Sequence, residues 1–188
     1  MDRKVIPCLV ALFAVSGCGQ AATSPARDDG AATVNSPAQA KLGLSSSAFQ
    51  DGQTIPQQYS CDGANQSPPL RWGEPPPGTK SFALTIDDPD APGGTFRHWA
   101  VFDMPATTRS LAAGQQIGTQ GTNDKGTPGY SGPCPPRGNP PHHYHLRLFA
   151  LDVERLDLAP NAKVVDVENT AAKHALGQGD LIGTYERR

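Results

Sequence analysis

Three stretches that alternate between apolar and other residues with a period of two constrain the fold most strongly. They cover residues 82–86, 98–102 and 144–151, and the third is apolar on both faces. This period is that of a β-strand, and a strand that is apolar on both faces is typical of the centre of a sheet. Turn-forming Pro and Gly clusters lie between the three stretches. The middle of the chain is therefore predicted to be mostly β.

The alternation also predicts which face each side chain occupies. His98 falls in step with Ala100 and Phe102, whereas Trp99 and Val101 fall on the opposite face. On this pattern His98 is expected to share a sheet face with Ala100 and Phe102.

Only the C-terminal part of the sequence has a pattern that predicts helices. Apolar residues from about Val164 to Leu176 recur at helical spacing, and Gly177 is suited to end the helix. A second short helical turn is predicted over Asp180 to Glu186. The expected fold class is mostly β, all-β or α+β.

The first residues predict export. Arg3 and Lys4 precede an apolar run of eleven residues, Val5 to Val15, which is too short to span a bilayer. A positive start, a short apolar run and small residues before a cut describe a secretory signal. The ending Val-Ser-Gly-Cys at 15–18 resembles a lipobox, which would make Cys18 the lipid-carrying first residue. The alternative is an ordinary cleaved signal peptide, which would release a soluble secreted protein.

These features predict three parts of the chain. Residues 1–17 are assigned to a lipoprotein signal peptide, 18–41 to the lipidated Cys18 and a flexible linker, and 42–188 to one folded domain. Gly19 is not an inner-membrane retention signal, so the expected location is the outer membrane or the outward face of the cell envelope. The anchor would be the membrane contact of the protein.

Two cysteines remain in the predicted domain, Cys61 and Cys134. In an oxidising compartment a disulfide between them is the favoured outcome. A nucleophilic Cys134 is the alternative, although an exported catalytic thiol would need protection from oxidation. The charge balance, 16 Lys and Arg against 18 Asp and Glu, argues against a nucleic-acid partner.

Polar residues of three segments carry the candidate chemistry. Asp87, Asp88 and Asp90 follow an apolar strand, and a hairpin would fold His98 back toward them. The simpler alternatives are a solvated Asp-Pro turn and a His packed at a strand edge. If extended backbone starts at His142, then His142 and Tyr144 share one face, so that an imidazole and a phenol could line one pocket.

Four motifs in order resemble the two signature regions of the phosphatidylethanolamine-binding protein family, also called Raf kinase inhibitor-like proteins. They are Asp88-Pro89-Asp90-Ala91-Pro92, His98-Trp99, Gly132-Pro133 and His142-His143-Tyr144. Ser67 to Trp72, the Gly-Pro-Cys-Pro-Pro turn at 132–136 and Gly183-Thr184-Tyr185 are similar to the bacterial branch. The resemblance covers almost all of residues 42–188.

The resemblance implies a large antiparallel sheet packed on a smaller one, with peripheral helices and a shallow pocket for phosphate-like groups. The residues that it assigns to the pocket are Asp88, Asp90, Pro92, His98, Gly132, Pro133, His142 and Tyr144. Two positions depart from the family pattern. Arg97 stands where Trp often precedes the strand His, and His143 stands where Arg usually follows the second His. By alternation both should point away from the pocket.

Two functions are weighed. The first is binding of a phosphate-containing small molecule or phospholipid head group without turnover or cofactor, with modulation of another protein as a further role. His98, Tyr144 and backbone N–H groups near Gly132 would hold the anion. The second is a metal-dependent hydrolase that uses the His and Asp residues, although His142 and His143 should face opposite ways.

Catalysis by a Ser or Cys nucleophile is less favoured, because the chain lacks a Gly-x-Ser-x-Gly motif. A homodimer through an exposed apolar helix face is also considered.

Overall fold

The computed structural model describes residues 40–188. The predicted signal peptide, Cys18 and nearly all of the predicted linker therefore lie outside the described residues. Residues Ala40 and Lys41, assigned to the linker, form strand β1 and pair with the last strand.

A large sheet forms the centre of the described part, in the order β1-β10-β9-β5-β6-β8, with β3 also paired to β10. Its strands are β1 (Ala40–Lys41), β3 (Gln53–Thr54), β5 (Ser81–Asp88), β6 (Phe96–Pro105), β8 (Thr119–Gln120), β9 (His142–Leu151) and β10 (Ala175–Tyr185). The neighbours from β10 to β8 pair antiparallel, and the short β1 and β3 pair parallel to β10. The predicted strands are thus confirmed as β5, β6 and β9.

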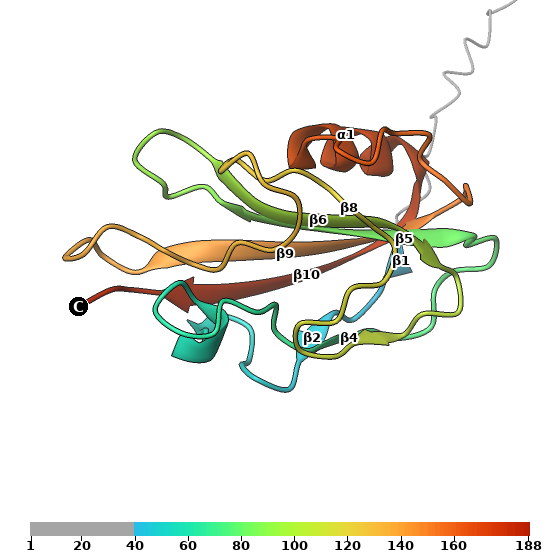
Figure 1. Cartoon of the computed structure of the whole chain (residues 1–188). Coiled ribbons are helices and arrows are strands. Elements are labelled where there is room, and N and C mark those ends of the chain that lie inside the picture. Colours follow the sequence, from blue (N-terminus) through green and yellow to red (C-terminus); the bar gives the residue numbers. More distant parts are fainter. Residues whose placement is uncertain (1–39) are drawn as a thin grey trace, which may run out of the picture. The chain divides into compact units, whose positions relative to one another are not determined.

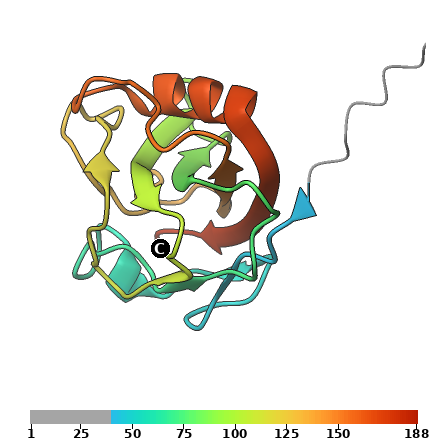
Figure 2. The ribbon, with the colours of Figure 1, turned by 90° about the vertical axis from the view of Figure 1, so that its right-hand side faces the viewer.

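Two further layers cover the faces of this sheet (Figures 1 and 2). Helix α1 (Val164–His174) packs on one face through Val164, Val167 and Ala171. The small sheet covers the other face, and it consists of β2 (Ser45–Ser46), β4 (Leu70–Arg71) and β7 (Ser110–Leu111), near the 3-10 helix η1 (Gln57–Tyr59). The predicted fold class, a large sheet on a smaller one with a C-terminal helix, is confirmed.

Helix α1 turns Val164, Val167 and Ala171 toward the sheet, where they are fully buried, whereas Val165 is half-buried and Ala172 is exposed. Arg147 of β9 ties the helix to the sheet, because it pairs with Asp87 of β5 at 3.0 Å and with Glu168 of α1. Burial raises the pKa of Asp87, and Arg147 opposes that shift. The homodimer through an exposed helix face stays a prediction.

The predicted helical turn over Asp180 to Glu186 is wrong, because Asp180 to Tyr185 belong to strand β10 and Glu186 follows it. The predicted helix also ends earlier, at His174, and Leu176 and Gly177 already lie in the strand. A strand rich in glycine has a weak sequence signal.

Packing explains why β10 has glycine at these positions. A Cβ at Gly183 would lie 2.5 Å from Ile55 Cγ1, and one at Gly177 would lie 2.8 Å from the Ala40 carbonyl oxygen. Ile55, which follows β3, and Ala40 of β1 therefore approach the β10 backbone too closely for side chains at these positions.

A β-bulge in β6 changes the face of His98. Ile86 pairs with Trp99 and the next residue of β5, Asp87, pairs with Arg97, so His98 is an extra residue without a partner across the ladder. A bulge re-aims the side chain of the strand that carries it. The His98 ring consequently contacts Tyr144, on the face opposite to Ala100 and Phe102. The face predicted for His98 is therefore wrong.

Candidate functional site

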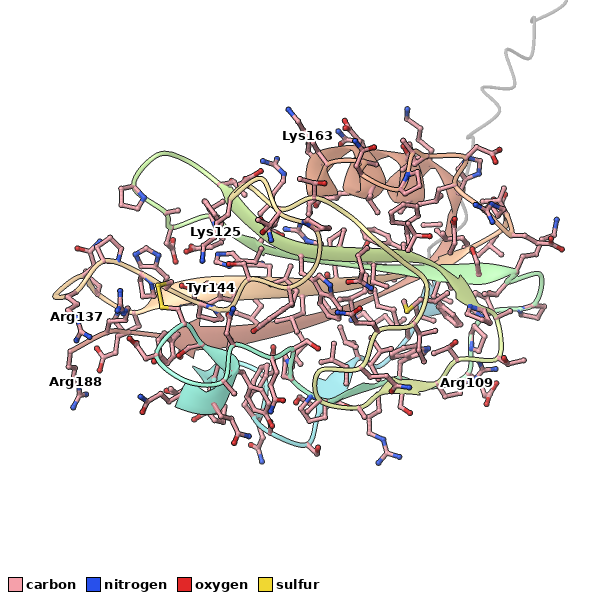
Figure 3. All side chains as sticks on the ribbon, viewed as in Figure 1. Arg109, Lys125, Arg137, Tyr144, Lys163 and Arg188 are labelled. Carbon is pink, nitrogen blue, oxygen red and sulfur yellow. A yellow bond between two sulfur atoms is a disulfide. The ribbon has the colours of Figure 1, made fainter. Side chains whose placement is uncertain are left out.

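A cavity of about 300 Å³ lies where β5 ends, β6 begins and β9 begins. It is lined by Asp88, Ala91, Pro92, Phe96, His98, Lys125, Cys134, Pro135, Pro136 and His142. Figure 3 shows Tyr144, Lys125 and the yellow disulfide at this end of the molecule, near the C-terminus. Segments far apart in the sequence thus meet at one end of the sheet.

Asp88 and His142 form a buried pair, with 2.8 Å between Asp88 Oδ2 and His142 Nδ1. The other carboxyl oxygen, Asp88 Oδ1, accepts the Asp90 backbone N–H at 2.9 Å and so fixes the start of the loop. Because a carboxylate only accepts hydrogen bonds, His142 Nδ1 carries a proton. The Nε2 atom of His142 is therefore the ring nitrogen available to a ligand in the cavity.

His98 is fixed by the same ring atom. Its Nδ1 lies 2.7 Å from the Ser131 carbonyl oxygen, which only accepts, so Nδ1 carries the proton and Nε2 remains for the cavity. Burial lowers the pKa of His98, and the Ser131 hydrogen bond and the Asp88 charge oppose that shift. The neutral ring is therefore the dominant form in the empty site at neutral pH.

Tyr144 lies behind His98 rather than on the cavity lining. The two ring centroids are 5.2 Å apart, and the tyrosine side chain is fully buried. Its hydroxyl makes no hydrogen bond of good geometry within residues 40–188, although the Asp88 side chain and the Cys134 backbone lie close to it. Burial, with a smaller contribution from the Asp88 charge, raises the pKa of Tyr144, so the phenol stays neutral. Tyr144 therefore packs against the His98 ring on the side away from the cavity lining.

The predicted site residues separate into two groups. Asp88, Pro92, His98 and His142 line the cavity. Asp90, Gly132, Pro133 and Tyr144 lie beside or behind it, outside its lining. As the alternation predicts, His142 and Tyr144 are buried on one face of β9 and His143 is exposed.

Asp90 forms hydrogen bonds with His143, one of the two residues that depart from the family pattern. Its Oδ2 accepts the His143 backbone N–H at 2.8 Å and lies 2.7 Å from His143 Nδ1. This contact lowers the pKa of Asp90. The other departing residue, Arg97, faces Asp124 at 4.0 Å. Both departures thus form contacts outside the cavity.

The backbone N–H groups of Ser131 and Gly132 are not available to a ligand. Ser131 N donates to the His98 carbonyl oxygen at 3.0 Å, and Gly132 N donates to Asn65 Oδ1 at 2.8 Å. A Cβ at Gly132 would lie 2.5 Å from the Tyr59 carbonyl oxygen. Gly132 and Pro133 therefore position the Cys134 to Pro136 wall, and the backbone donors of Ser131 and Gly132 are already used within the protein.

Sequence reasoning missed the remaining lining residues, and Lys125 matters most among them. Its backbone N–H donates to Asn123 Oδ1 at 3.0 Å, while Asn123 Nδ2 donates to the Gly129 carbonyl oxygen at 2.9 Å. The buried Asn123 therefore holds the loop that brings the lysine to the cavity. Neither the spacing nor the surrounding residues of Lys125 signal this position in the sequence.

Cys61 and Cys134 form a disulfide, as predicted. Cys61 N also donates to the Pro133 carbonyl oxygen at 3.0 Å, so the proline-rich wall is fastened to the segment after η1. With its sulfur in this bond, Cys134 has no thiolate to offer, and the alternative of a nucleophilic Cys134 is not supported.

Two absences within residues 40–188 bear on the alternatives. No group of three or more His, Cys, Asp or Glu side chains in this range is placed to hold one metal ion. Within the same range, no helix has the length and apolar character needed to cross a membrane.

Comparisons with known proteins agree with this geometry. Residues 45–186 match the family model described as phosphatidylethanolamine-binding protein. A relative from Aquifex aeolicus, "UPF0098 protein", is 48% identical over 76% of this chain and 86% of its own length. "Putative lipoprotein LppC" of Mycobacterium tuberculosis is 44% identical over 82% of this chain and 77% of its own length. The crystal structure of Escherichia coli YbcL, titled a new member of the mammalian PEBP family, superposes with a TM-score of 0.74 at 33% identity, over 79% of this chain and all of that one.

Proposed function

The chain belongs to the phosphatidylethanolamine-binding protein family, and from this premise we propose that its cavity binds the phosphate group of a small molecule or phospholipid head group without turnover. The observation that carries the proposal is that both His98 and His142 are held in place by a hydrogen bond through Nδ1. Both rings are pre-oriented, and each has Nε2 left to donate to an anion once it is protonated. Pre-orientation reduces the entropy that binding would otherwise cost.

The charges at the cavity favour a zwitterionic ligand. Lys125 supplies a positive charge at the rim, and the anion itself would favour the protonated form of His98. The Asp88 carboxylate accepts a hydrogen bond from His142, and it would also attract a nearby ammonium group. Pro92, Phe96 and Pro135 offer apolar walls to the organic part of the ligand. Phosphoethanolamine-like head groups combine these features.

Replacing either imidazole is expected to weaken binding of glycerophosphoethanolamine by roughly tenfold to a hundredfold. This corresponds to the loss of one hydrogen bond to a charged group. Lys125→Gln should weaken binding less, because an exposed charge is screened by solvent. Calorimetric titration of the full chain, its His98→Ala and His142→Ala variants and Lys125→Gln measures these effects.

Lys163→Gln is the matched control. Lys163 is an exposed cation at the start of α1, away from the cavity (Figure 3), and its replacement should leave affinity unchanged. Wild-type affinity in both His variants would show that the cavity is assigned wrongly. The titration is repeated with EDTA and with Zn²⁺, and a product signal by NMR that requires Zn²⁺ would instead favour the metal-dependent hydrolase.

Affinity is also expected to fall as the pH rises. In the empty site the pKa of His98 lies below its ordinary value, and a bound anion must raise it. Affinity is therefore highest at pH values below the pKa that His98 has in the free protein. It falls as the pH rises from that value to the pKa that His98 has in the complex, and it is constant and low above the latter. Glycerophosphoethanolamine is a suitable probe because its phosphodiester does not titrate in this range. Calorimetry across weakly acidic to weakly basic pH should give a smaller slope for His98→Ala than for the parent, and an equal slope would contradict this prediction.

We also propose that the protein is exported and held at the cell envelope by lipid on Cys18. The name of the Mycobacterium tuberculosis relative supports this proposal, and so does the disulfide, which is typical of oxidising compartments. A lipid anchor would place the cavity near phospholipid head groups.

A further inference from the structure

A second cavity, of about 250 Å³, shares no lining residue with the first and is chemically unlike it. Trp99 and Tyr130, the neighbours of His98 and Ser131 in the sequence, contribute to it. Five carboxamide or hydroxyl side chains come from two loops, and Gln120 comes from β8. The polar lining residues are Asn65, Gln66, Ser67, Gln115, Gln116 and Gln120. Every lining side chain is uncharged.

Three of these carboxamides have a fixed orientation. Asn65 Oδ1 accepts Gly132 N–H at 2.8 Å, and Gln115 Oε1 accepts Ala112 N–H at 2.7 Å. Gln120 Oε1 accepts Trp99 Nε1–H at 2.7 Å. Because each oxygen is used by a donor of the chain, the amide cannot flip without losing that bond. Each of the three therefore has its NH₂ group left for other acceptors.

The NH₂ group of Gln120 is an unsatisfied donor. Its Nε2 atom is buried and has no hydrogen-bond partner within residues 40–188. A buried donor without a partner costs about 1–3 kcal/mol, so such groups are usually met by water or by a ligand. Beside it, the Trp99 and Tyr130 rings stand edge to face with centroids 5.7 Å apart and provide an apolar wall. Tyr130 already donates its hydroxyl to the Tyr59 carbonyl oxygen, so only its ring is available.

We propose that this cavity is a binding site for a neutral, polyhydroxylated ligand of the size of one sugar ring. Sugar hydroxyl oxygens accept from oriented NH₂ groups, and the C–H face of the ring packs on aromatic side chains. A fully charged anion would find no positive side chain on the lining to offset its lost hydration, and an apolar ligand would leave the amides unsatisfied. The volume is just under the range of about 300–1,000 Å³ usual for drug-sized ligands, which suits a single ring.

The test follows the side-chain NH₂ signals of the full chain by ¹H–¹⁵N NMR during titration with glucose, galactose, mannose and N-acetylglucosamine. Binding in the millimolar range is expected, with shifts of the Asn65, Gln115 and Gln120 NH₂ signals and of the Trp99 indole N–H. In the variants Gln115→Glu and Gln120→Glu, a carboxylate oxygen can still accept the hydrogen bond from Ala112 N–H or Trp99 Nε1–H. The side-chain NH₂ group that would donate to the sugar is removed. Each should bind about tenfold more weakly, as the loss of one hydrogen bond implies.

Three controls make the result decisive. Gln58→Glu, an exposed glutamine outside the cavity, should leave sugar affinity unchanged, and so should His98→Ala, which lies on the other cavity. Gln115 is exposed, so its variant keeps the test valid if Gln120→Glu fails to fold. The proposal is overturned if no sugar of the panel shifts these signals, if Gln115→Glu binds as well as the parent, or if sulfate shifts the same signals as strongly as the sugars.

Discussion

Replacing Cys61 and Cys134 together with serine is expected to lower the free energy of unfolding by about 4 kcal/mol. The disulfide joins residues 73 positions apart, and in the chain-entropy model a closed loop of that length removes roughly this much free energy from the unfolded ensemble. Cys134 also lines the first cavity, in the wall that Cys61 helps to fasten. Loss of the bond should therefore weaken glycerophosphoethanolamine binding as well as stability.

Urea unfolding, followed by tryptophan fluorescence, measures the change in stability. The parent protein treated with reductant should approach the stability of the double variant, and the double variant should not respond to reductant. If the two proteins differ by less than about 1 kcal/mol under oxidising conditions, the disulfide does not constrain the chain as proposed.

Cys18→Ser is expected to abolish lipid attachment and to release the protein from the membrane fraction. Each acyl chain contributes about 0.8 kcal/mol per buried CH₂ group, and a single chain gives only marginal anchoring, so a lipoprotein cysteine with two or three chains should hold firmly. Within residues 40–188 no helix is long and apolar enough to cross a membrane. The change should therefore be close to all-or-none.

Incorporation of labelled fatty acid and fractionation of cells measure this effect. Cys8→Ser is the matched control, because Cys8 lies within the apolar run that would be removed with the signal. It should retain both the label and the membrane association of the parent. Equal labelling of the Cys18→Ser variant would show that the Val-Ser-Gly-Cys ending is not a lipobox.

The two cavities differ in their chemistry. One contains two histidines, a carboxylate and a lysine, and the other presents oriented amides without charge. Asn65 contributes to both, because it lines the second cavity and accepts from Gly132, which positions the wall of the first. The variants proposed for each cavity therefore avoid Asn65.

The sequence by itself determined the central strands, the start of α1 and the disulfide. Strands β5, β6 and β9 are recognisable because each has one or two apolar faces, and burial of such a face is decided by the residues of the strand itself. Asp88, His98 and His142 were identified because polar groups at the ends of apolar strands are unusual and the motifs resemble a known family.

Only the tertiary structure decided what joins these strands into a site. Strand β10 has glycines where Ile55 and Ala40 closely approach its backbone, and the bulge at His98 depends on how β5 and β6 pair. Lys125 reaches the cavity through the hydrogen bonds of Asn123. Short-range patterns report which residues are buried, whereas a bulge, a close approach or a loop position is set by contacts between distant segments. Those contacts leave no periodic signal in the sequence.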